Sequence, residues 1–297
     1  STGETGIEED LMISTILTLW MALLAAPELD RLDPPASLKA GVLIVAGGGS
    51  LPADLRPRAL ELAGGDDANI LIIGWASSRE NAGASTAEAW KQSGATRVTV
   101  IPEEAAAARS AIESADLIWL CGGSQLRLMD ALRERDLIDV VKKCHAQGTI
   151  LSGTSAGAAV MSRYMITGEA ELEALLKSTT ELVEGLGLWP GVIVDQHFLA
   201  RRRWARLFSA VADHPDQIGV GIDEQTAVIV DPDGSWQVIG RGPVVVIDGR
   251  GKVAETLQSE GPAKVVMYDL TVHFVGKGQV WKPGSTSAED PNDERRR

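Results

Sequence analysis

Short, mainly apolar runs alternate with longer mixed stretches through the first half of the chain. Apolar runs of this length indicate strands buried on both faces, and they lie at residues 41–46, 69–74, 97–101, 116–121 and 148–152. The stretches between them have the length of helices and lie at residues 55–63, 84–93, 103–114 and 126–147. This alternation predicts an α/β fold, with a doubly wound, mostly parallel sheet and helices on both faces.

The pattern changes after Gly221. Short apolar runs now follow one another with turn residues between them, such as the Asp-Pro-Asp-Gly at residues 231–234. Such runs indicate antiparallel hairpins, and they lie at residues 227–230, 236–239, 244–247 and 264–268. We expect these strands to extend the same sheet, so that residues 41–284 form one catalytic domain. The polar and charged tail at residues 285–297 is predicted to be disordered.

The first 40 residues form a separate N-terminal segment. Residues 11–27 carry no charge and end in small residues, and the part at residues 12–26 has the shape of a signal peptide, although no basic residues precede it. A buried or amphipathic N-terminal helix is the other interpretation. The localisation therefore stays open: secreted or periplasmic in the first case, cytoplasmic in the second.

Charge and composition narrow the function classes. The 28 Lys and Arg against 41 Asp and Glu give a net charge of −13, which disfavours nucleic acid and anionic membranes as partners because both need a positive surface. Two cysteines exclude a disulfide scaffold, and four histidines without metal-ligand spacing disfavour zinc. We expect chemistry without a metal or cofactor, on a small or peptide substrate.

The strongest chemical motif follows the predicted strand at residues 148–152. Residues 153–157 read Gly-Thr-Ser-Ala-Gly and precede an apolar stretch, so that a G-x-S-x-G motif stands between a strand and a helix. This context is typical of a nucleophile elbow, in which a sharp turn presents the serine hydroxyl. The motif predicts Ser155 as nucleophile and the amide of Ala156 as an oxyanion donor. A glycine- and serine-rich loop is the alternative.

A serine needs a base to remove its proton. His197 ends an apolar run, where such a sheet presents reactive groups, whereas His145 is expected on a solvated helix face and His214 in a polar turn. The base needs an acid to orient it. Residues 223–224 (Asp-Glu) follow another apolar run, and their spacing alone does not choose between them.

Glycines and arginines form three further clusters. Residues 122–125 (Gly-Gly-Ser-Gln) follow a strand and offer Gly123 as a second oxyanion donor, or form an ordinary turn. The glycines at residues 47–49 do not complete a dinucleotide fingerprint, since Pro52 stands at its last position. A basic cluster is either a solvated face or a carboxylate site, and it comprises Arg201, Arg202, Arg203 and Arg206.

Together these motifs resemble the cyanophycinase family of serine peptidases (family S51), which is related to dipeptidase E within the class-I glutamine-amidotransferase-like superfamily. The resemblance covers about residues 41–250. Its markers are Ala-Ser-Ser-Arg-Glu at residues 76–80, Gly-Gly-Ser-Gln at 122–125, Gly-Thr-Ser-Ala-Gly-Ala at 153–158, Asp-Gln-His-Phe at 195–198 with the arginines that follow, and Gly-Ile-Asp-Glu at 221–224.

The resemblance implies a serine-type exopeptidase with Ser155 as nucleophile, His197 as base and Glu224, rather than Asp223, as the third member. Its substrate would be cyanophycin, a polyaspartate that carries arginine on its side chains, or another β-aspartyl peptide, and its products β-Asp-Arg dipeptides. The resemblance allows a homodimer. It also implies a set of substrate-binding residues, namely Gln125, Asp195, Gln196, Arg201 and Arg203.

One departure from the family concerns the substrate. The family usually has aspartate where this chain has Ser124, so a carboxylate that would select a cationic side chain is missing. Trp75 is bulky for its loop and is expected to narrow the pocket. Two alternatives stay open: an α- or β-aspartyl dipeptidase of the dipeptidase E kind, and a non-catalytic binding module that keeps the elbow only as a turn.

Overall fold

The structure is a computed structural model that describes residues 41–79, 81, 83–170, 175–250, 254–257 and 263–282. These residues all belong to one unit of the chain, Ser37–Arg297. The predictions for residues 1–40 and 285–297, including the signal-peptide interpretation, lie outside the described residues.

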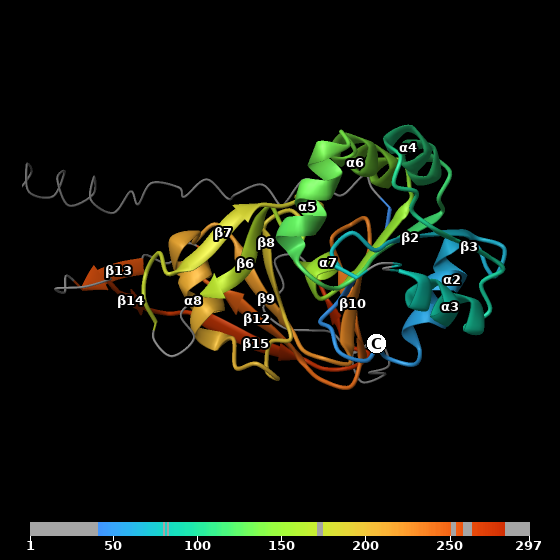
Figure 1. Ribbon diagram of the computed structural model, residues 1–297. Helices are drawn as coiled ribbons and strands as arrows, with labels where there is room; N and C mark the ends of the chain where they lie inside the picture. The colour runs from blue at the N-terminus through green and yellow to red at the C-terminus, as the bar shows by residue number, and fades with distance from the viewer. Residues whose placement is uncertain are drawn as a thin grey trace, which may run out of the picture. The chain divides into compact units, whose positions relative to one another are not determined.

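The predicted parallel strands pair in one sheet. Its first five strands are parallel in the order β1-β5-β4-β2-β3, and three antiparallel strands, β10, β11 and β16, continue it beyond β1 (Figure 1). β3 is the edge strand and largely exposed, not buried on both faces as its sequence predicts. The strands are β1 Leu43–Ala46, β2 Asn69–Ile73, β3 Arg97–Val100, β4 Leu117–Leu120, β5 Ile150–Thr154, β10 Thr226–Val230, β11 Trp236–Gly240 and β16 Val280–Trp281.

Helices cover both faces of this sheet, as predicted. Neighbouring residues of β1 point to opposite sides: Leu43 and Val45 join one apolar cluster, Ile44 and Ala46 the other. Each cluster takes its helix side chains from different helices, so the sheet is buried from both sides. The second cluster contains α2 Leu55–Ala63 and α3 Ala84–Gln92, and the first contains α4 Ala105–Glu113, α5 Gln125–Glu134, α6 Ile138–Ala146 and α7 Ala156–Ala159.

A second sheet departs from the prediction. Residues 226–230 and 236–240 extend the first sheet as expected, but residues 244–248 join a four-stranded sheet in the order β15-β12-β9-β8. Both edges of β10 are already occupied by β1 and β11, so β12 pairs with β9 instead. The strands are β8 Val192–Gln196, β9 Ile218–Ile222, β12 Val244–Asp248 and β15 Thr271–Val275.

Helix α8 (Trp204–Asp213) packs on this second sheet, and two hairpins complete the described chain (Figure 1). One hairpin joins β6 (Tyr164–Ala170) to β7 (Thr180–Glu184), and the other joins β13 (Ala254–Leu257) to β14 (Lys264–Met267). The strand predicted at residues 264–268 therefore pairs with β13 and does not extend the first sheet. In the second sheet β8 and β9 run parallel. Their carboxyl ends, like those of β1, β4 and β5, therefore lead into loops that can carry reactive groups.

The single helix predicted at residues 126–147 is two helices. Asp136 has a φ of 54°, in the left-handed region, and the N–H of Leu137 donates to the carbonyl of Leu132 at 2.9 Å. This arrangement ends a helix and is usually made by glycine. Because aspartate tolerates the conformation better than most residues, the sequence carries no glycine to mark the break.

We expect Asp136→Gly to stabilise the protein. Asp136 is exposed, and glycine adopts a positive φ without the steric cost of a Cβ atom, so the free energy of unfolding should rise by up to about 1 kcal/mol. The same change at Asp139, which is exposed inside α6, should lower it by a similar amount. Urea denaturation measures both; a loss of stability in Asp136→Gly would contradict the assignment.

Candidate active site

Ser155 stands at a sharp turn between β5 and α7. Its backbone has φ 54° and ψ −112°, a conformation rare for a residue with a side chain, and its N–H donates to the carbonyl of Ala46 at 3.0 Å. Both flanking glycines are needed. A Cβ on Gly153 would lie 2.2 Å from the carbonyl oxygen of Gly157, and a Cβ on Gly157 would lie 2.2 Å from that of Leu120.

His197 follows β8 and faces this serine. Its Nε2 lies 2.9 Å from the Ser155 hydroxyl oxygen, and its Nδ1 lies 2.6 Å from a carboxylate oxygen of Glu224, which follows β9. The other candidate acid, Asp223, turns its side chain elsewhere and accepts the N–H of Ala200 at 2.9 Å. The structure thus brings an alcohol, an imidazole and a carboxylate from three strand ends into one hydrogen-bonded row.

The glycine run after β1 forms the wall against which this row packs. A Cβ on Gly48 would lie 2.3 Å from Cε1 of His197, and a Cβ on Gly49 would lie 2.9 Å from Oε2 of Glu224. The carbonyl of Gly47 also accepts the N–H of His197 at 2.7 Å. In the sequence these glycines only disfavour a dinucleotide site. Three glycines in a row directly after a buried strand indicate that another group approaches the backbone closely.

The surroundings of His197 disfavour its charged form. Burial is the main cause that lowers its pKa, and the positive charges of Arg201 and Arg203 lower it further, while the hydrogen bond and charge of Glu224 act in the opposite direction. The net effect is a pKa below the ordinary value of 6.5. His197 is therefore neutral, and able to accept a proton, at neutral pH.

The loop after β4 lies beside the serine. A Cβ on Gly122 would be 3.3 Å from Cβ of Ser155, and Gly123, with a φ of 144°, lies against the carbonyl of Ala76. Within the described residues, no hydrogen bond uses the N–H of Gly123 or that of Ala156. Both amides predicted as oxyanion donors are thus free of protein acceptors there.

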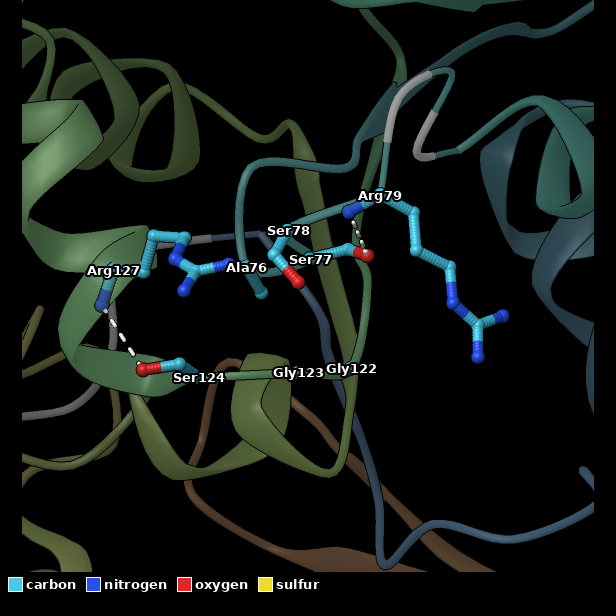
Figure 2. A pocket seen from close by; sticks show the side chains of 8 residues that line it. All are labelled: Ala76, Ser77, Ser78, Arg79, Gly122, Gly123, Ser124 and Arg127. Atoms are coloured by element: carbon cyan, nitrogen blue, oxygen red, sulfur yellow. Dashed lines mark hydrogen bonds between the residues drawn. The ribbon is translucent and has the colours of Figure 1, made fainter.

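This loop is one wall of a pocket of about 510 Å³. The pocket is lined by residues 76–79 on one side and by residues 122–124 and Arg127 on the other (Figure 2). Trp75 does not line it, contrary to expectation. Its ring is buried beneath the guanidinium of Arg135, at 4.5 Å, and its Nε1 donates to Glu103 at 3.2 Å.

The residues expected to bind substrate are mostly internal. Asp195 is completely buried and forms an ion pair with Arg206, which is also buried, and its Oδ1 lies 3.7 Å from Arg203. Gln196 accepts a hydrogen bond from Arg203 at 2.9 Å. These side chains form a charged network, the Asp195 cluster, directly beside His197 and hold the chain on both sides of it.

The other two expected residues differ from each other. Gln125 is buried and donates to the carbonyl of Ile166 in β6 at 2.9 Å, so its side chain fastens α5 to that strand. Arg201 is exposed. Of the five residues expected to bind substrate, Arg201 alone presents its side chain to solvent.

Burial also shifts the pKa values of charged groups in the Asp195 cluster. Burial raises the pKa of Asp195, against the effect of Arg206 and Arg203. Burial and the neighbouring arginine Arg206 lower the pKa of Arg203 to about 10. Each charge in the cluster therefore depends on its partners, since the side chains of Asp195, Arg203 and Arg206 are all buried.

The remaining histidines lie outside the row. His145 is not on a solvated face as expected: it is 2% exposed, and its Nδ1 lies 3.0 Å from the carbonyl of Thr149. The helix turns it inward, away from its lysine neighbours. His214 stacks on Tyr164 at 3.9 Å, and His273 lies edge-on to Trp281.

Two kinds of feature are absent from the described residues. They hold no group of three or more His, Cys, Asp or Glu side chains that could bind a metal ion. No helix among them is both long and apolar enough to cross a membrane.

Comparison with known proteins places the chain in a family. The model of Peptidase family S51 matches residues 43–238. The chain is 36% identical over 269 residues to the cyanophycinase of Trichormus variabilis (strain ATCC 29413 / PCC 7937), covering 85% of this chain and 87% of that protein. It is 35% identical over 258 residues to the cyanophycinase of Geminocystis herdmanii (strain PCC 6308), covering 81% and 93%.

Two solved peptidase structures have a fold similar to that of this chain. The crystal structure of a peptidase from an acI-B1 actinobacterium superposes with a TM-score of 0.55 at 26% identity, covering 77% of this chain and 97% of that one. A putative peptidase E from Listeria monocytogenes EGD-e shares the fold at 15% identity, with a TM-score of 0.50 and coverage of 68% and 98%.

The fold and these matches define a hydrolase of the peptidase class. The chain belongs to peptidase family S51, and the curated relatives described above are cyanophycinases. The resemblance inferred from the motifs, and the α/β fold that it implies, are confirmed.

Removal of Asp195 should be costly. Asp195→Ala leaves the buried Arg206 without its counter-charge, and breaking a buried pair in this way lowers the free energy of unfolding by about 3–5 kcal/mol. The matched control is Asp130→Ala, which removes an exposed ion pair with Arg133 and should cost at most about 0.5 kcal/mol. Denaturant unfolding of both variants checks this. Similar small losses would show that the Asp195 cluster is not a structural element.

Proposed function

We propose that this protein is a serine-type peptidase that cleaves aspartyl peptide bonds, with Ser155 as nucleophile, His197 as general base and Glu224 as the acid that orients it. The observation that carries the proposal is the row of contacts at 2.9 Å and 2.6 Å between these three side chains. The proposed substrate is cyanophycin, and the proposed products are β-Asp-Arg dipeptides. The cyanophycinase relatives, similar over most of their length, support this substrate.

The chemistry follows from the row. Nε2 of His197 takes the hydroxyl proton as the Ser155 oxygen attacks the aspartyl carbonyl. Glu224 stabilises the imidazolium that forms, and at 2.6 Å from Nδ1 it also keeps the proton of the neutral ring on Nδ1, so that Nε2 is free to accept. His197 then gives its proton to the leaving amine. Water attacks the acyl-enzyme by the same steps, and Ser155 is regenerated.

The negative charge on the oxygen of the tetrahedral intermediate needs hydrogen-bond donors to stabilise it. The amides of Ala156 and Gly123 are our candidates, because neither is used by the protein within the described residues. Ala156 follows Ser155 in the chain, and Gly123 follows Gly122, whose Cβ would lie 3.3 Å from Cβ of Ser155. A donor held in place before the reaction costs no reorganisation when the charge develops. The strained turn at Ser155 sets this arrangement before any substrate arrives.

The direct test is hydrolysis by wild type and by Ser155→Ala. We expect wild type to release β-Asp-Arg from cyanophycin, identified by mass, and Ser155→Ala to lose at least about 10⁴-fold in kcat because no nucleophile remains. Ser110→Ala is the control: among the described residues its hydroxyl donates only to the carbonyl of Ala106 within α4, and full activity is expected.

Other outcomes separate the alternatives. Turnover of small aspartyl dipeptides without action on the polymer would identify a dipeptidase of the peptidase E kind. Folded wild type without turnover of either, and without labelling of Ser155 by a serine-reactive phosphonate, would identify a non-catalytic binding module. Activity retained in Ser155→Ala would remove Ser155 from the chemistry.

The pH profile tests the base. Since His197 must be neutral to accept a proton and its pKa lies below 6.5, kcat/KM should rise with pH through a midpoint below 6.5 and then stay level. Arg201→Ala removes a positive charge that lowers this pKa, so the midpoint should move up, and added salt should reduce the difference. A midpoint above 6.5, or a downward shift in Arg201→Ala, would contradict the assignment.

A further inference from the structure

The pocket beside Ser155 contains groups that the proposed mechanism does not use. It has a volume of about 510 Å³, which suits a group of amino-acid size. Its wall at Gly122 approaches the nucleophile closely, since a Cβ on this glycine would lie 3.3 Å from Cβ of Ser155. The pocket therefore adjoins Ser155 on the side of Gly122.

The lining is cationic. Arg79 and Arg127 both line the pocket and are exposed, and neither forms an ion pair with any carboxylate in the described part of the chain. Other arginines of this acidic protein do form such pairs, namely Arg58, Arg133, Arg135, Arg203, Arg206 and Arg250. Among the described residues, the pocket lining contains no Asp or Glu. Arg79 and Arg127 therefore line the pocket without a counter-charge from the other described lining residues.

The local backbone adds donors. Helix α5 begins at the pocket, with Ser124 as its N-cap residue; the Ser124 hydroxyl accepts the N–H of Arg127 at 3.3 Å. The start of a ten-residue helix carries partial positive charge. Figure 2 shows the Arg127 side chain directed toward the loop of Ala76 and Ser78. The hydroxyl of Ser78 is a further hydrogen-bond donor.

We propose that this pocket binds a carboxylate of the substrate next to the bond that Ser155 attacks, with Arg127 as the principal contact and Arg79 as the second. The proposal rests on the proposed function, since it takes the substrate to be an aspartyl peptide. A guanidinium matches a carboxylate in shape and charge. In a protein with a net charge of −13, an anionic group needs such a local site because the overall field repels it.

The test measures binding, so that it does not depend on turnover. Ser155→Ala serves as the parent, and its ligands are β-Asp-Arg and the same dipeptide with its arginine carboxylate converted to an amide. We expect the parent to bind the acid at least about tenfold more tightly than the amide by calorimetry. Adding Arg127→Gln should remove most of this preference and leave amide binding within about threefold.

Two further variants complete the design. Arg97→Gln, added to the same parent, removes an exposed arginine at the amino end of the edge strand β3 and should leave the preference unchanged. Ser124→Asp places a carboxylate in the pocket while keeping a good N-cap residue, and it should reverse the preference in favour of the amide.

The outcomes distinguish this proposal from the proposed function. Equal affinity of the parent for acid and amide, including no binding of either, would overturn the pocket assignment, as would equal effects of Arg127→Gln and Arg97→Gln. An Arg127-dependent preference in a protein whose wild type cleaves no aspartyl peptide would overturn the proposed function and leave the carboxylate site standing.

Discussion

The imidazole of His197 occupies a space in which no further side chain fits, and the rest of the site depends on that constraint. The proposed base belongs to the second sheet, whereas the proposed nucleophile belongs to the first, and the glycines after β1 let the two approach. A Cβ on Gly48 would lie within 2.4 Å of two ring atoms of His197. The backbone of Gly47 also bonds directly to the histidine. This contact is therefore one of those that join the two sheets, together with the apolar side chains that both contribute to one cluster.

The groups around His197 have opposite effects on its pKa. Glu224 favours the imidazolium, while burial, Arg201 and Arg203 oppose it. Arg203 is in turn held by the buried Asp195 cluster, so this network contributes to both the position and the proton affinity of the imidazole.

Sequence alone predicted the contiguous motifs well, but it predicted poorly which strands share a sheet and which charged side chains are buried. The strand–serine–helix context of Ser155 is contiguous in the chain, so its turn could be recognised. The second sheet could not be predicted, because the apolar run at residues 244–247 fits either sheet and only the occupied edges of β10 decide. The burial of Arg203 and Arg206 could not be predicted either, since a run of charged residues is usually solvated. Their partner Asp195 lies eight to eleven positions away in the sequence.

The state of His197 tests the central claim most directly. We expect ¹⁵N-edited NMR of the wild-type protein at neutral pH to show a proton on Nδ1, shifted downfield by the 2.6 Å contact with Glu224, and none on Nε2. Glu224→Ala should abolish the downfield signal while the fold stays intact. A proton on Nε2 at neutral pH, or a signal indifferent to the loss of Glu224, would contradict the hydrogen-bonded row of Ser155, His197 and Glu224.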